Sequence, residues 1–210
     1  MTDDPALLHL RALLDRHGDA LLALAAASIR FPLSGRTLSV RPGDVAPELM
    51  QPGAAFVTLR REEELRGCIG SHNPWRPLVT DVIENAAAAA FAEPRFQRLV
   101  VSELDGLSLS LSLLTPPTPV PAASEAELLA KLRPGRDGVM LKDAGRRGLF
   151  LPEMWHELPA PAEFMAWLKR KAGFPETHWS SSLQVWRFET LSVKAPDIGR
   201  LPDSAPFQPS

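Results

Sequence analysis

Residues 107 to 113 alternate perfectly between leucine and serine, and this run places the tightest limit on the fold. Leucine occupies every odd position and serine every even one. Successive side chains of a β-strand point to opposite faces of a sheet. The run therefore predicts a strand with one face in a hydrophobic core and the other face polar.

Other patterns predict the elements around this strand. Apolar residues at helical spacing predict two N-terminal helices, which Gly18 separates and which end before Pro32. A capping box of Ser124 and Glu127 predicts a short helix through Leu132. The remaining predicted elements are a hairpin of strands 55–60 and 65–70, a helix over 77–91, a hairpin of strands 138–142 and 148–151, a helix over 161–172 and a strand over 183–188.

Because the predicted strands occur in hairpins and no repeated βα unit is present, the sequence predicts an α+β fold. We expect a mixed or mainly antiparallel sheet flanked by helices. Residues 1–194 are predicted to form a single domain. Residues 195–210 contain four prolines and little apolar pattern, so they are predicted to form a proline-rich tail.

Charge and composition exclude several classes of function. The net charge of −2 and a pI near 6.2 argue against binding to nucleic acid or to a membrane surface. The chain has no signal-peptide pattern and no apolar run long enough to span a membrane, which predicts a cytoplasmic protein. A single cysteine and five scattered histidines give no zinc-type spacing, so no metal site is predicted.

The run LRGCIG, from Leu65 to Gly70, is the most distinctive chemical feature of the chain. It has neither the lysine of a phosphate-binding loop nor the third glycine of a dinucleotide fingerprint. On a strand, Arg66 and Cys68 share one face, and an arginine near a thiol favours the reactive thiolate. His72 could act as a base after a turn. Cys68 is therefore a candidate nucleophile, although free cysteine more often packs as a small apolar residue.

Further residues are candidates for ligand binding, each with a structural alternative. Gly67 and Gly70 would let a ligand approach the main chain, or would permit a bulge or a tight contact with the alanine-rich helix. Ser71 could help to hold an anion at a helix start, or could act as a cap. Asn85 could line a cleft or bond to a loop. Arg95 and Arg147 could bind an anionic ligand or form ion pairs.

Several sequence blocks together point to a known family. In order, they are LRGCIG, ENAAAAAFAEPRF, ELDGLSLSLSLLTPP, LRPGRDGVML, GRRGLFLPEMW, WLKRKAGFP and VWRFE. Through these motif blocks, the chain closely resembles the AMME-chromosomal-region protein family, also called AmmeMemoRadiSam system protein A, from about Leu21 to Glu189. The resemblance extends to the corner 93–96 and to Arg146–Gly148. The chain departs from the family in its tail, in lacking tyrosine, and at residues 71–73, where relatives vary.

The resemblance implies a fold in two unequal lobes, with LRGCIG in or near the region between them. It also implies genes that neighbour a Memo-like protein and a radical-SAM enzyme. Two hypotheses follow. In one, the chain is a component of that system, and Cys68, with Arg66 and His72, lines a cleft that acts on or binds a small molecule. In the other, the chain is a non-catalytic adaptor that binds a protein or a modified peptide in the same cleft. Neither a reaction nor a cofactor is predicted.

The tryptophans of the C-terminal part are interpreted as packing residues, namely Trp155, Trp167, Trp179 and Trp186.

Overall fold

A computed structural model describes residues 4–201 and divides the chain into two compact units. Unit 1 combines the chain up to Leu114 with the chain from Leu191 onward, and unit 2 comprises Thr115–Thr190. Each unit contains helices and a four-stranded sheet of its own. The predicted α+β class is thus confirmed, with one four-stranded sheet in each unit.

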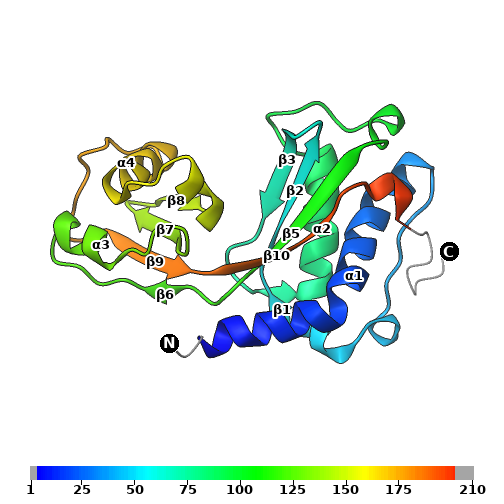
Figure 1. Cartoon of the computed structure of the whole chain (residues 1–210), viewed down its shortest axis with the longest axis horizontal. Helices are drawn as coiled ribbons and strands as arrows, with labels where there is room; N and C mark the ends of the chain where they lie inside the picture. Colours follow the sequence, from blue (N-terminus) through cyan, green and yellow to red (C-terminus); the bar gives the residue numbers. More distant parts are fainter. Residues whose placement is uncertain (1–3, 202–210) are drawn as a thin grey trace. The chain divides into compact units, whose positions relative to one another are not determined.

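Unit 1 places both of its long helices on one face of its sheet (Figure 1). The strand order is β10–β5–β2–β3, and β3 lies at an edge. A two-stranded ladder of β1 and β4 leads into α2. The elements of this unit are α1 (Pro5–Leu33), β1 (Pro52–Gly53), β2 (Ala55–Arg61), β3 (Glu64–Gly70), β4 (Arg76–Pro77), α2 (Leu78–Phe91), β5 (Leu107–Leu114) and β10 (Thr190–Ala195), with 3-10 turns at Pro42–Asp44, Pro47–Met50, Val101–Glu103 and Ile198–Arg200.

The leucine and serine alternation forms β5, as predicted. Its odd-numbered leucines are at most 1% exposed and face the core beneath the helices. On the opposite face, Ser112 lies 2.8 Å from the hydroxyl of Ser192 in β10. The sheet therefore buries an apolar face under α1 and α2 and presents hydroxyl groups on its other face.

Three sequence expectations for unit 1 are wrong. Gly18 does not divide the first helix, because α1 is continuous and Gly18 lies against β10, where a Cβ would stand 3.3 Å from Val193 Cγ1. Pro32 lies inside the last turn of α1. The predicted tail begins too early, since Ala195 ends β10 and Ile198 is fully buried in the core. Residues 202–210 of that tail lie outside the described residues.

Unit 2 is built around its own sheet, with strand order β6–β9–β7–β8. Its core contains Trp155 stacked on Phe164, with ring centroids 3.8 Å apart. The elements are β6 (Thr118–Pro119), α3 (Glu125–Lys131), β7 (Gly138–Asp143), β8 (Arg146–Phe150), a 3-10 turn at Pro152–His156, α4 (Pro161–Lys171) and β9 (Gln184–Phe188). The predicted cap of α3 is confirmed, because the Ser124 hydroxyl accepts from the Glu127 backbone N–H at 3.2 Å. Among residues 4–201, no helix is long and apolar enough to cross a membrane.

Candidate functional site

The LRGCIG segment forms most of β3, the edge strand of the sheet in unit 1. Gly67 faces α2, because a Cβ added there would lie 2.2 Å from the backbone oxygen of Ala89. Cys68 pairs with Thr58 of β2 and lies on the face that α2 does not cover. The register of β2 and β3 shifts between Gly67 and Leu65, so Arg66 is the extra residue of a bulge, and alternation alone does not place it on the face of Cys68.

The two glycines of the segment are surrounded differently. The backbone of α2 rests directly on Gly67, which is the tight contact with the alanine-rich helix that the sequence offered as an alternative. Gly70 lies beneath the ring of Phe56 in β2, where a Cβ would meet Phe56 Cγ at 2.2 Å. Close approach within the chain therefore accounts for both glycines, and their role toward a ligand stays a prediction.

Cys68 is partly accessible and is held on two sides. The Thr58 hydroxyl of β2 donates to Cys68 Sγ at 3.5 Å, and the Cys68 backbone N–H donates to Glu93 Oε2 at 3.3 Å. An outward N–H on an edge strand has no strand partner, so a buried carboxylate is a suitable acceptor for it. Glu93 thus fixes the main chain that carries the thiol.

Glu93 also holds Arg95, two residues along the chain. Arg95 Nε and Nη2 donate to the two carboxylate oxygens at 3.0 and 2.8 Å. This paired bond keeps the pKa of Glu93 below its usual value and raises that of Arg95, to which the nearby Cys68 also contributes. The Arg95 side chain is 56% exposed, whereas that of Glu93 is 5% exposed. Glu93 thus joins Arg95 to the main chain of Cys68, and the guanidinium of Arg95, although paired with that carboxylate, remains open to solvent.

Arg66 is occupied by a different carboxylate. Its Nε and Nη2 donate to Glu103 at 2.7 and 3.0 Å, and Nη2 also donates to the Gln97 carbonyl at 2.9 Å. The same pair keeps the pKa of Glu103 below its usual value. Arg66 is therefore paired with Glu103, and its predicted effect on the thiol stays a prediction. We refer to Arg66, Cys68, Glu93, Arg95 and Glu103 as the Cys68 cluster.

Ser71 and Asn85 belong to a second group, which we call the Asp81 cluster. Asp81 of α2 is fully buried and accepts from the Ser71 hydroxyl at 2.6 Å, from Arg76 Nε at 2.7 Å and from Asn85 Nδ2 at 2.9 Å. It also accepts the Ala55 backbone N–H at 2.9 Å. These contacts tie the start of β2, the end of β3 and the first turns of α2 together.

Asp81 and Arg76 were not predicted as site residues. The available signal was a carboxylate and an amide four positions apart, at 81 and 85, on one face of a helix that is otherwise apolar. Side chains four positions apart on a helix are neighbours. If Asp81 and Asn85 are both buried, their polar atoms need hydrogen-bond partners in the same place. The sequence offered a bond from Asn85 to a loop; the Asn85 amide instead donates to the carbonyl of Ala55, the first residue of β2, at 3.0 Å.

The other predicted residues lie elsewhere. His72 is partly buried in the bend after β3. Arg147 is exposed on β8 and belongs to unit 2. Neither position tests the predicted roles of these side chains. Among residues 4–201, no group of three or more histidine, cysteine or acidic side chains is arranged to hold a metal ion.

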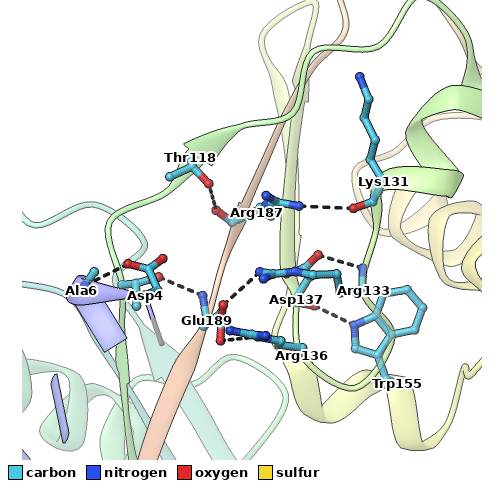
Figure 2. A network of polar contacts seen from close by, with 11 residues as sticks. Asp4, Ala6, Thr118, Lys131, Arg133, Arg136, Asp137, Trp155, Arg187 and Glu189 are labelled. Atoms are coloured by element: carbon cyan, nitrogen blue, oxygen red, sulfur yellow. Dashed lines mark hydrogen bonds and ion pairs between the residues drawn. The ribbon is translucent and has the colours of Figure 1, made fainter. Parts of the chain in front are cut away.

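Unit 2 contains a third polar network, the Glu189 cluster (Figure 2). Buried Glu189 accepts from Arg133 Nη2 and from Arg136 Nε, each at 2.9 Å. Arg133 also binds fully buried Asp137, with Nε 2.9 Å from Oδ1, and this pair raises the pKa of Arg133. The Trp155 indole N–H donates to the Asp137 carbonyl at 2.6 Å. The buried acids are satisfied within the unit, which favours a structural role.

The sequence blocks that indicated the family supply the residues of two of these polar networks. The first three supply the members of the Cys68 cluster, namely LRGCIG, ENAAAAAFAEPRF and ELDGLSLSLSLLTPP. LRPGRDGVML, GRRGLFLPEMW and VWRFE supply Arg133, Arg136, Asp137, Trp155 and Glu189. Sequence segments that lie far apart thus provide the partners for one polar cluster in each unit.

Comparisons with known proteins agree with the motif blocks. The profile of a family described as AMMECR1 matches residues 22–193. A protein of Methanothermobacter thermautotrophicus is 35% identical over 174 residues, which cover 82% of this chain and 91% of that protein. A protein of Thermococcus gammatolerans is 37% identical over 186 residues, covering 83% and 88%. The crystal structure of the uncharacterized protein PH0010 from Pyrococcus horikoshii superposes with a TM-score of 0.80 at 31% identity, covering 93% of this chain and 97% of that one.

Proposed function

This chain belongs to the AMMECR1 family, and from that premise we propose that it is a component of a system containing a Memo-like protein and a radical-SAM enzyme. Within that system it binds or acts on a small molecule at the LRGCIG segment of unit 1. The gene neighbourhood that the family resemblance implies supports the choice of partners.

One observation carries the choice of site. Cys68 is partly accessible, and the Glu93 carboxylate that binds its backbone N–H also binds Arg95, whose side chain is 56% exposed. A ligand with an anionic group would bind Arg95 by charge-assisted hydrogen bonds and contact the thiol with a neighbouring atom. Glu93 contributes indirectly, because it positions both the Cys68 main chain and the Arg95 guanidinium.

A specific observation also favours the adaptor as the second candidate. Val100 and Val101 are 51% and 60% exposed, beside the Glu103 carboxylate that holds Arg66. The Val100 backbone N–H donates to that carboxylate at 3.0 Å, so the valines are presented on an anchored turn. Adjacent exposed apolar side chains on such a turn suit contact with another protein.

We expect Cys68→Ser to abolish complementation of a strain that lacks the gene, because serine keeps the size of the side chain and removes the thiol. The matched control is the double variant Val100→Ser/Val101→Ser, which alters the exposed turn and leaves the thiol in place. Both variants must unfold at the same temperature as the parent protein. Full complementation by Cys68→Ser, with loss of complementation in the double variant, would contradict the ligand site and support the adaptor.

A further inference from the structure

Unit 2 has a cavity that is independent of the Cys68 cluster. Its volume is about 310 Å³, and it is lined mainly by Trp179, Trp186, Leu183, Val120, Leu128 and Gln184. Leu128, Val120 and Val185 are buried core residues, whereas Trp179, Leu183 and Trp186 are only partly buried. The cavity therefore opens from solvent into the margin of the hydrophobic core. Two of the tryptophans interpreted as packing residues form part of its wall.

We propose that this cavity binds a neutral, planar aromatic molecule or the aromatic moiety of a larger compound. The residues that line it include no charged side chain, so a charged group would lose its hydration without a partner. Its volume lies at the lower end of the range of ~300–1,000 Å³ that is usual for small-molecule sites. Indole faces favour stacking with flat rings over contact with saturated ones.

The hydrogen-bonding groups of the wall narrow the chemistry further. Buried Trp155 donates its indole N–H to the Asp137 carbonyl, whereas Trp179 and Trp186 are partly exposed, and neither indole N–H is a buried donor that lacks a partner. An indole N–H that a ligand covers usually finds an acceptor. A ring nitrogen or carbonyl on the ligand would replace water in that role, so a compound that carries a hydrogen-bond acceptor suits the cavity.

The edge of the sheet argues against an added peptide strand at this position. Strand β6 is only Thr118–Pro119, and Pro119 carries no N–H to donate to a further strand. The next N–H along the chain, that of Val120, is already bonded to the Val185 carbonyl at 2.8 Å. A compact ligand therefore suits the cavity better than an extended peptide does.

The proposal is tested by ¹⁹F NMR of the full chain carrying 5-fluorotryptophan, which reports all five tryptophans separately. Quinoline, a neutral flat ring with an acceptor nitrogen, is expected to shift the Trp179 and Trp186 resonances and to reach saturation. Trp75 and Trp167, which are 69% and 45% exposed, report non-specific stacking, and Trp155, which is 3% exposed, reports the core. Quinoline-2-carboxylate and cyclohexanone, which respectively add a negative charge and remove aromaticity, are expected to give no saturable shift.

A variant tests the same assignment. Trp186→Leu removes one stacking face outside the buried core, and it is expected to abolish the saturable shift of Trp179 while the Trp155 resonance stays in place. Shifts that increase without saturation and equally at Trp75 and Trp167 would overturn the proposal. So would saturation by a proline-rich peptide without a response to quinoline. Because Cys68 takes no part, failure here would leave the proposed function of the LRGCIG segment untouched.

Discussion

Replacing Asp81 by alanine is expected to lower the free energy of unfolding by about 3–5 kcal/mol, the usual cost of removing one partner of a buried ion pair. The Asp81 side chain is 0% exposed and that of Arg76 is 12% exposed. Without the carboxylate, the guanidinium of Arg76, the Ser71 hydroxyl and the Ala55 N–H lose their shared acceptor. Urea unfolding followed by far-UV circular dichroism measures the change.

Glu84 provides a matched control for this experiment, because it binds the same arginine from the surface. Its side chain is 57% exposed and pairs with Arg76 Nη1. Glu84→Gln is expected to change the free energy of unfolding by less than about 1 kcal/mol, as is typical of exposed ion pairs. Equal effects of Asp81→Ala and Glu84→Gln would show that the Asp81 cluster does not stabilise the junction of β2, β3 and α2.

Gly67→Ala is expected to destabilise the protein by about 3 kcal/mol or more, at or above the upper end of the cost of overpacking a core. The new methyl group would lie 2.2 Å from the backbone oxygen of Ala89, and a helix backbone has no rotamer with which to move aside. Either α2 moves away from the sheet or β3 separates from β2. Chemical denaturation measures the loss, and hydrogen exchange shows whether it is concentrated in α2 and β3.

Alanine substitutions at two other glycines serve as controls. They show whether the loss of stability in Gly67→Ala comes from the close contact with α2 or from replacing any glycine. At Gly70 the obstacle is the ring of Phe56, which must leave its place while no backbone moves, so Gly70→Ala is expected to cost about 1–3 kcal/mol, less than Gly67→Ala. A methyl group at Gly43 would have open space within 4 Å, so Gly43→Ala should change stability by less than about 0.5 kcal/mol. If Gly67→Ala were as mild as Gly43→Ala, the packing of α2 on β3 described above would be wrong.

Local patterns predicted most of the elements. The alternation of β5, the hairpin of β2 and β3, and the cap of α3 each depend on residues that are close in sequence. β10 was not predicted, because only Glu189 separates it from β9 and no glycine or proline marks the break. That boundary exists because β9 and β10 pair with strands of different units, which no local pattern records.

The polar clusters were harder to predict for a related reason. Arg66 and Cys68 were recognised by residue type, but the acids that hold them, Glu103 and Glu93, lie 37 and 25 positions further along the chain. Only the fold brings a strand, a helix end and a 3-10 turn to the same edge. The motif blocks identified these segments without showing which side chains pair, and the pairing of Arg66 with Glu103 changes what that arginine can do for the thiol.

The central claim is that Cys68 is an accessible functional thiol, and its alkylation in the folded protein tests this most directly. Iodoacetamide near pH 7, followed by mass spectrometry of the Cys68 peptide, is expected to label the native protein. Labelling should be slower in Arg95→Ala, because this variant leaves the Glu93 carboxylate, which binds the Cys68 backbone N–H, without its counter-charge. Labelling that occurs only after denaturant is added would show that Cys68 is a packed core residue and would contradict the proposed site.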